Sequence, residues 1–351
     1  MTGGLVLTGI FTGALALAAA TAVAQERPGP AQEVPRFRSS VDLVSVAAVV
    51  RDRQGRFVTD LSRQDFEIVE GGEPRPILEF RAQVDAPVRV AVLVDVSGSM
   101  RVGGKQAAAR EAASHLFASL REGDQGAVYA FDTALSEAQS FTSDRAALGR
   151  ALESVAQPYG QTSLYDGIAQ TARLLVSASA EGDAPLTERA ALAVITDGID
   201  TRSRRTAHDV ALAASSIDVP VYIIAVMSAV DDPRVAQNRR QSELASDLRD
   251  LARGTGGDLF IASVPAEASL AARQIVGELR HQYVLAFEAS ERAGWRPLEV
   301  RTRHRSLTVR ARTGYAGGTQ TSRAAEATVG QFSIGPAASG SDRTLSRRHH
   351  Q

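Results

Sequence analysis

Residues Val90 to Met100 read Val-Ala-Val-Leu-Val-Asp-Val-Ser-Gly-Ser-Met, and this stretch decides the fold. Its first five residues are apolar, a pattern typical of a strand that is buried on both faces. Three oxygen-bearing side chains follow at alternate positions: Asp95, Ser97 and Ser99. Gly98 allows the backbone to turn sharply between the two serines. The stretch therefore predicts a buried strand that ends in an oxygen-rich loop.

A helical pattern at about 104–120 follows this loop, and the same rhythm continues along the chain. Between residues 86 and 282, apolar runs alternate with helical patterns, which indicates an α/β fold with a doubly wound, mostly parallel sheet. Further strands are predicted at 127–131, 190–196, 219–226 and 258–262, and further helices at 143–155, 163–180, 206–217, 241–253 and 266–280. In such sheets ligands bind at the carboxyl ends of the strands, so the oxygen-rich loop is a candidate site.

The two segments that flank the α/β region, residues 37–85 and 283–316, are predicted to form β-structure. Gly71-Gly72 is a hairpin signal between a strand at 66–70 and a returning strand at 75–80. We hypothesise that the two flanking segments form an accessory β-sandwich, with the α/β region inserted between them.

The first residues carry a targeting signal. No charged side chain occurs from Gly3 to Ala24, and Ala22-Val23-Ala24 has the small-x-small form of a signal-peptidase site. We interpret residues 1–24 as a signal peptide and expect a protein exported to the periplasm or the exterior of a bacterial cell. The alternative is an uncleaved membrane anchor, because about 20 apolar residues can span a bilayer. Residues 25–36 are interpreted as a linker, and residues 317–351 as a disordered tail.

The composition excludes several classes of function. Apolar residues make up 44% of the chain and charged residues 23%, as in an ordinary globular protein. The net charge of -1 gives no indication of a nucleic-acid partner. The chain has no cysteine, which excludes disulfides, thiolate metal sites and a cysteine nucleophile.

A near match to a phosphate-binding P-loop lies just after the oxygen-rich loop. Ser99 is followed after four residues by Gly104, Lys105 and Gln106, and Lys105 is the only lysine of the chain. The first glycine of the P-loop motif is missing, and Gln106 replaces its magnesium-binding Ser or Thr. Nucleotide binding is therefore not expected.

Two further stretches are predicted to place oxygen ligands at the same edge of the sheet. Thr162 lies in the sequence Gly-Gln-Thr-Ser-Leu-Tyr-Asp before a predicted helix, and Asp197 follows the predicted strand at 190–196. The complete set offers two carboxylates and three hydroxyls, from Asp95, Ser97, Ser99, Thr162 and Asp197. These are hard oxygen ligands, which suit Mg²⁺ or Mn²⁺ rather than zinc. Because hydroxyls are neutral, the metal would keep positive charge and attract an Asp or Glu carboxylate of a partner protein.

Simpler roles are open for the same residues and their neighbours. The serines could merely cap the following helix. Asp166 is placed to cap a helix or to interact with its dipole, and Asp200 to support the loop after Asp197 or to be solvated. Arg202, Arg204 and Arg205 are expected to form a positively charged rim, which could also attract an acidic partner.

Asp95-x-Ser97-x-Ser99, Thr162 and Thr196-Asp197-Gly198 together resemble the metal-ion-dependent adhesion site of von Willebrand factor type A domains. The resemblance covers about residues 86–282. It implies that the two serines and the threonine contact the metal directly. It also implies that the two aspartates act directly or through water.

The flanking segments resemble an exported bacterial group of von Willebrand factor A-related proteins first noted in Acidobacteria. The matching landmarks are Asp65-Phe66 and Glu70-Gly71 near the beginning, and Arg312-x-Gly314-Tyr315 near the end. This resemblance implies export, and it leaves the biological role undefined.

We therefore expect an exported, non-enzymatic, adhesion-type module that captures a partner carboxylate through Mg²⁺ or Mn²⁺. Two alternatives stay open: a metal-assisted hydrolase, in which a metal-bound water is the nucleophile, and a structural scaffold of an envelope assembly. Hydrolysis would need a general base near that water, and the sequence identifies none, so no catalytic residue is assigned. Contact with a membrane is expected only if the N-terminal segment stays uncleaved.

Overall fold

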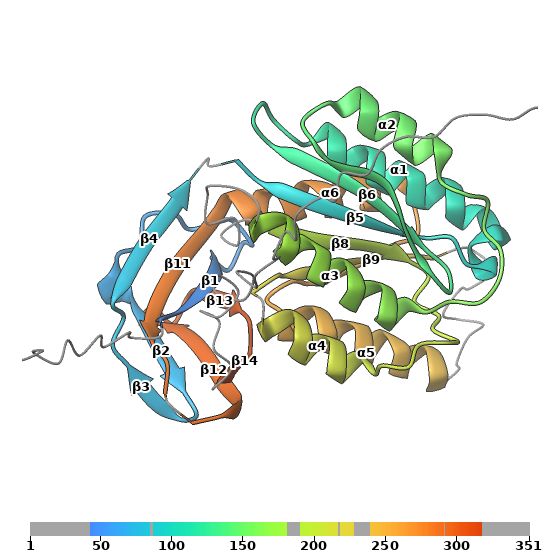
Figure 1. The fold of residues 1–351 in the computed structure, drawn as a ribbon. Coiled ribbons are helices and arrows are strands. Elements are labelled where there is room, and N and C mark those ends of the chain that lie inside the picture. The colour runs from blue at the N-terminus through green and yellow to red at the C-terminus, as the bar shows by residue number, and fades with distance from the viewer. Residues whose placement is uncertain are drawn as a thin grey trace, which may run out of the picture. The chain divides into compact units, whose positions relative to one another are not determined.

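The structure of the protein is a computed structural model (Figure 1). It describes residues 43–84, 87–180, 190–216, 218–227, 239–290 and 292–317. The predicted signal peptide, the predicted linker and the predicted tail beyond Gly317 lie outside these residues. No helix in the described ranges is long and apolar enough to cross a membrane. The mixed α/β class predicted from the sequence is confirmed.

Six strands form the central sheet of the α/β part, in the order β10 (Leu259–Ala262), β9 (Val221–Val226), β8 (Ala190–Thr196), β5 (Arg89–Asp95), β6 (Gln125–Phe131) and β7 (Leu135–Thr142). All neighbouring strands pair in parallel except β7, which pairs antiparallel with β6 at the edge. The sequence analysis missed β7 because this edge strand buries few side chains and so has no apolar run.

Helices cover both faces of this sheet: α1 (Lys105–Ala118), α2 (Arg145–Ser154) and α6 (Pro265–Arg280) on one face, and α3 (Leu164–Ala180), α4 (Ala207–Ser216) and α5 (Arg239–Gly254) on the other (Figure 1). Successive side chains of a strand point to opposite faces. On β5, Val90, Val92 and Val94 therefore pack against the first group of helices. Ala91 and Leu93 pack against the second group. A 3-10 segment, η2 (Gly98–Gly104), leads from β5 into α1.

The flanking segments form two antiparallel sheets. One has the order β13 (Thr308–Ala311), β1 (Leu43–Arg51), β11 (His281–Glu288) and β4 (Glu79–Val84); the other has the order β14 (Gly314–Gly317), β12 (Gly294–Thr302), β2 (Phe66–Glu70) and β3 (Glu73–Arg75). A 3-10 turn, η1 (Arg63–Asp65), precedes β2. Each sheet contains strands from both flanks, with Val46 opposite Leu285 and Ile68 opposite Val300. Both sheets contribute to one apolar core, as the sandwich hypothesis predicted.

The hairpin at Gly71-Gly72 differs from the prediction in its returning strand. The turn itself is as predicted, and the two glycines have positive φ angles of 58° and 91°. The returning strand β3 ends at Arg75, whereas β4 belongs to the other sheet. Pro76 has no N–H to donate to a strand ladder and directly follows the last paired residue of this edge strand. Leu78 N already donates to Ala286 O of β11, at 2.7 Å.

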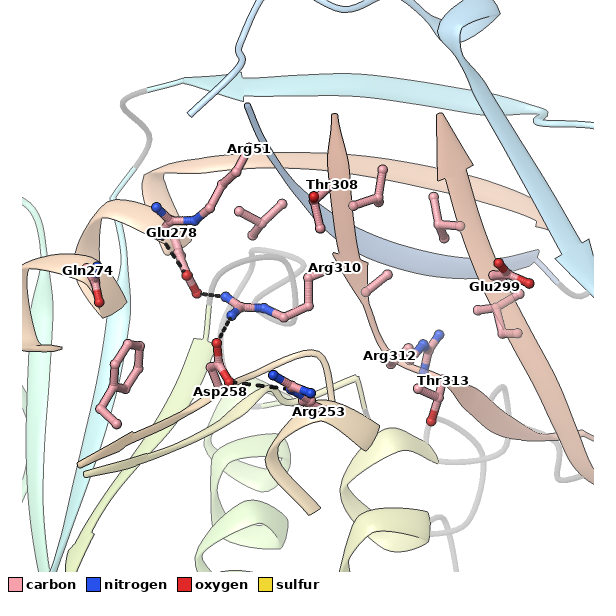
Figure 2. Close-up of a pocket in the computed structure, with 16 residues that line it drawn as sticks. Arg51, Arg253, Asp258, Gln274, Glu278, Glu299, Thr308, Arg310, Arg312 and Thr313 are labelled. Atoms are coloured by element: carbon pink, nitrogen blue, oxygen red, sulfur yellow. Dashed lines mark hydrogen bonds and ion pairs between the residues drawn. The ribbon is translucent and has the colours of Figure 1, made fainter. Parts of the chain in front are cut away.

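The sandwich adjoins the amino ends of the parallel strands, because β4 leads into β5 and α6 continues directly into β11. A cavity of about 690 Å³ lies at this junction (Figure 2). Arg51 of β1 and Arg310 of β13 both pair with Glu278 of α6, and Arg310 also pairs with Asp258, just before β10, at 2.7 Å. These ion pairs connect the sandwich to the α/β part.

Candidate metal centre

The candidate ligands lie at the carboxyl edge of the parallel sheet, at the opposite end of the strands from the sandwich. Asp95 is the last residue of β5, and Asp197 directly follows β8, the neighbouring parallel strand. Ser97 and Ser99 lie in the turn that follows β5, and Thr162 lies shortly before α3. Three loops therefore bring the predicted ligands to one edge, as the sequence analysis expected. That they bind a cation stays a prediction.

The Asp95 carboxylate is fully buried and is held by two donors. Thr196 Oγ1 donates to its Oδ2 at 2.6 Å, and the Ser97 N–H donates to its Oδ1 at 2.8 Å. Desolvation raises the pKa of Asp95 to about 6, because it outweighs the hydrogen bonds from Thr196 and Ser97; the nearby Asp197 carboxylate adds a smaller rise. A buried anion thus lies at this edge at neutral pH, and a cation beside it would offset the cost of desolvation.

The hydroxyl oxygens of Ser97 and Ser99 lie 3.1 Å apart. The two hydroxyls form a hydrogen bond at this distance. Neighbouring ligands of an octahedral Mg²⁺ lie about 2.9 Å apart when each is about 2.05 Å from the ion, so the spacing is also compatible with adjacent ligands. The helix-cap alternative has no support from the geometry. Ser97 is the N-cap of η2 without a side-chain capping bond, and the N-cap of α1 is Gly104.

Backbone hydrogen bonds fix the threonine loop against the serine loop. Gly98 N donates to Gly160 O at 3.0 Å, and Tyr159 N donates to Val96 O at 2.9 Å. A Cβ atom on Gly98 would lie 3.0 Å from Gly160 O, so a side chain at this position would press the two loops apart. Thr162, only 2% exposed, follows directly in the loop that is fixed in this way.

The loop after β8 secures Thr162 from its other side. Thr201 N and Arg202 N donate to Thr162 O at 3.0 and 2.9 Å. In return, Thr162 N donates to Thr201 Oγ1 at 2.9 Å. The loop after β8 thus satisfies both backbone polar groups of Thr162. These hydrogen bonds connect the loop that carries Thr162 to the loop that carries Asp197.

Asp197 forms a buried ion pair with Lys105, the first residue of α1. Lys105 Nζ lies 3.0 Å from Asp197 Oδ2, and the two side chains are 3% and 2% exposed. Among the described residues, the carboxylates of Asp95 and Asp197 and the ammonium of Lys105 have a formal charge of −1 together. A divalent cation would change the charge to +1, which favours an additional anionic ligand.

Two further aspartates support the loops. Asp200 Oδ1 accepts a hydrogen bond from Leu164 N, at the start of α3, at 2.8 Å. Asp166, in the first turn of α3, pairs with Arg205 at 2.7 Å. Both aspartates thus join α3 to the loop after β8, which is a supporting role and not that of a ligand.

Three residues of the site have contacts that the sequence analysis did not predict. The Thr196 hydroxyl binds Asp95, Thr201 binds Thr162, and Lys105 binds Asp197. The hydroxyl of Thr196 at the end of a predicted strand was a weak indication that this residue belongs to the site. Lys105 stood out because it is the only lysine of the chain. Nothing local in the sequence distinguishes Thr201 from other loop threonines.

The chemistry of the site is that of a cation-binding site built partly from hydroxyls. Across the described residues, no group of three or more His, Asp or Glu side chains comes together to hold a metal. A cation at the carboxyl edge would therefore depend on the serine and threonine hydroxyls as well as on the carboxylates. Neutral ligands leave such a cation electrophilic, so it would act as a Lewis acid toward an oxygen from outside.

The sequence matches a known domain family. Residues 90–199 match the sequence model of the von Willebrand factor type A domain. No curated protein matches the chain.

Three similar solved structures have a low sequence identity to this chain. The conserved hypothetical protein BatB from Bacteroides thetaiotaomicron is 19% identical over 55% of this chain and 98% of that chain, with a TM-score of 0.42. A von Willebrand factor type A protein from Catenulispora acidiphila is 14% identical over 81% and 76%, with a TM-score of 0.44. The vWF domain of the type V pili tip protein Mfa5 from Porphyromonas gingivalis is 19% identical over 36% and 42%, with a TM-score of 0.29.

The family assignment rests on the sequence match and not on these weak structural similarities. The matched residues begin in β5 and end just after β8, so they include all five candidate ligands. Residues 90–199 therefore belong to the von Willebrand factor type A domain family.

Proposed function

We propose that the α/β part is a non-enzymatic protein-binding module that captures an Asp or Glu carboxylate of a partner through Mg²⁺ or Mn²⁺. The observation that carries this proposal is the pair of serine hydroxyls, 3.1 Å apart, beside the buried Asp95 carboxylate. Asp95, Ser97, Ser99, Thr162 and Asp197 would hold the ion. The ion would supply a Lewis acid that binds the partner's carboxylate, and domains of this family generally bind proteins.

The surface around the site supports a protein partner. Val102, Tyr159 and Ile199 are large apolar residues that are 49%, 77% and 38% exposed, each in a loop that contributes to the site. Exposed apolar and aromatic side chains near a polar centre are typical of protein-binding surfaces. Arg202 and Arg204 are also exposed, and their charge would favour encounter with an acidic partner.

The engagement of the two carboxylates supports binding over hydrolysis. Asp95 accepts two hydrogen bonds, and Asp197 is paired with Lys105. A general base needs a carboxylate or imidazole with a lone pair directed at the attacking water, and these contacts already engage both aspartates. A phosphatase and esterase screen tests the alternative, because metal-dependent turnover that Asp197→Ala abolishes would favour a hydrolase.

We further propose that the protein acts outside the cytoplasm. The uncharged N-terminal segment that ends in Ala22-Val23-Ala24 supports export. N-terminal sequencing of the protein from a bacterial periplasmic fraction tests this proposal. A mature chain that begins at Gln25 is expected, and an intact N-terminus in the cytoplasmic fraction would contradict it.

Metal binding is tested by thermal shift and calorimetry on the purified chain. Mg²⁺ or Mn²⁺ at about 100 times its dissociation constant is expected to raise the free energy of unfolding by about 2.7 kcal/mol. Ser99→Ala and Asp95→Ala should reduce or abolish this gain. Ser154→Ala, which removes a hydroxyl bonded to Ala151 O in α2, is the matched control. An equal gain in all four chains would refute the proposed ligands.

Partner capture is tested with the envelope fraction of the source organism. The native chain should retain a protein in the presence of Mg²⁺ and release it when the metal is chelated, whereas Asp95→Ala should retain none. Retention that survives chelation would instead favour the scaffold alternative.

A further inference from the structure

Lys105 is turned toward the candidate metal centre by an unusual backbone. Gly103 and Gly104, immediately before it, have positive φ angles of 66° and 76°, a conformation that other residues adopt only with strain. They end η2 and start α1, so that the first side chain of the helix points back to the carboxyl edge of the sheet. The ammonium reaches Asp197 at 3.0 Å.

Burial of this lysine needs an explanation. Lys105 is only 3% exposed, and a buried ammonium is costly unless an anion compensates it. Among the described residues, a compensating anion is the candidate metal ligand Asp197, which follows β8 and lies 92 residues further along the chain. Asp197 would therefore interact both with the Lys105 ammonium and with any metal ion that binds at the site.

The charge of the site follows from this sharing. Without Lys105, two carboxylates would neutralise a divalent ion completely. With Lys105, these two carboxylates, the ammonium and the divalent ion have a formal charge of +1 together, in a region where most of the described side chains are buried. Charges of the same sign repel strongly over a few ångströms at the low effective dielectric of a protein. A carboxylate from outside would remove this excess charge.

We propose that Lys105 is a built-in counter-cation that weakens the binding of metal alone and makes it depend on an added carboxylate. This inference rests on the proposed function, because it describes how the same site is regulated. Metal and carboxylate then bind cooperatively, and each raises the affinity for the other by the same factor. The site would retain metal firmly only while a partner is bound.

The test measures Mg²⁺ affinity by calorimetry, with the native chain and with Lys105→Met, in sodium acetate and in sodium chloride of equal ionic strength. The native chain should bind Mg²⁺ more tightly in acetate than in chloride. Lys105→Met, which keeps the length of the side chain and removes its charge, should bind Mg²⁺ in chloride at least about tenfold more tightly. It should also lose most of the acetate effect. Lys105→Arg, which retains the charge, is the control and should keep the native pattern.

The outcomes separate this inference from the proposed function. If the native chain binds Mg²⁺ and Lys105→Met binds it equally or more weakly, Lys105 only anchors α1, and the inference is overturned while the metal site stands. If neither chain binds Mg²⁺ or Mn²⁺, the proposed function fails as well. If Lys105→Met does not fold, the affinity of the native chain for Mg²⁺ still tests the inference. Identical Mg²⁺ affinity in acetate and in chloride overturns it.

Discussion

The Thr196 hydroxyl is both a donor and an acceptor at the candidate metal centre. It donates to Asp95 Oδ2 at 2.6 Å and accepts from Gly198 N at 3.0 Å, and the residue is fully buried. The hydroxyl therefore orients the Asp95 carboxylate and also shapes the turn that carries Asp197. A single side chain connects the ends of two strands that are neighbours only in the folded sheet.

Replacement of Thr196 by valine tests this connection. Thr196→Val keeps the shape and removes the hydroxyl, so the buried carboxylate and Gly198 N each lose a partner. We expect the free energy of unfolding to fall by about 1–3 kcal/mol at pH 7, as measured by urea denaturation. Thr196→Ser keeps the hydroxyl and should be closer to the native chain. Equal losses in the two variants would point to the methyl group instead.

Gly98 determines how closely the serine and threonine loops approach. Gly98→Ala would place a Cβ 3.0 Å from Gly160 O and shift the two loops relative to each other. We expect Mg²⁺ affinity to fall by at least about tenfold, because octahedral Mg²⁺ tolerates little displacement of its ligands. Gly149→Ala in α2, where a Cβ meets no atom within 4 Å, is the control. Calorimetry that shows unchanged affinity for Gly98→Ala would contradict the fit of the site.

At the scale of the elements, one buried carboxylate joins the four strands of the second antiparallel sheet. Glu70 of β2 accepts hydrogen bonds from Arg75 of β3, Arg296 of β12 and Tyr315 of β14. Glu70 and Tyr315 are two of the landmarks noted in the sequence, and they lie 245 residues apart. The landmarks of the two flanks thus meet in one hydrogen-bonding cluster.

This cluster predicts a dependence of stability on pH. Desolvation would raise the pKa of Glu70, but the hydrogen bonds from Tyr315 and Arg296 and the charge of Arg75 outweigh it and lower the pKa. The folded chain therefore binds a proton at Glu70 less readily than the unfolded chain. The stabilisation is present above the ordinary glutamate pKa and is lost as the pH falls through the lowered value.

Glu70→Gln tests this dependence. We expect a loss of about 2–3 kcal/mol at pH 7, the size of a hydrogen bond to a charged group. The difference from the native chain should shrink as the pH is lowered below 4, as measured by urea denaturation at several pH values. Glu67→Gln, at an exposed position of the same strand, should change stability little at any of these pH values. A pH-independent difference for Glu70→Gln would contradict the lowered pKa.

At the scale of the whole described structure, the sandwich and the candidate metal centre lie at opposite ends of the parallel strands. The cavity of Figure 2 lies at the sandwich end, and the lining carboxylates of Asp258 and Glu278 are already paired with arginines of the same lining. Glu278 is central to these pairs, since Arg51 and Arg310 both contact it and its side chain is only 2% exposed. The cavity thus marks a structural junction, at the other end of the strands from the candidate metal centre.

Glu278→Gln tests the junction. Loss of the charge leaves two arginines without their shared anion, and breaking a buried ion pair from one side costs about 3–5 kcal/mol. We expect a correspondingly lower Tm in calorimetry, with the sandwich and the α/β part unfolding less cooperatively. Glu299→Gln, in the lining of the same cavity, removes an exposed pair with Arg301 and should cost less than about 1 kcal/mol. Equal effects of the two substitutions would argue against the junction.

Much of the fold was predictable from the sequence because its signals are local. The apolar run of β5 and the alternation of strands and helices indicated a doubly wound sheet. Predicted strands such as 66–70 and 190–196 agree with β2 and β8. Edge strands were harder: β7 buries too little to show a pattern, and the predicted strand at 75–80 is divided between two sheets. In both cases the neighbouring strand, not the segment itself, decided the outcome.

By itself, the sequence determined which residues end the strands and therefore which oxygen atoms gather at the carboxyl edge. The direction of the chain and the spacing of its apolar residues are sufficient to predict where these strands end. Only the tertiary structure decided that Lys105 pairs with Asp197, that Thr196 holds Asp95 and that Tyr315 meets Glu70. These partners are 92, 101 and 245 residues apart. Such contacts depend on strand order and register, which bring together side chains whose local sequences contain no information about each other.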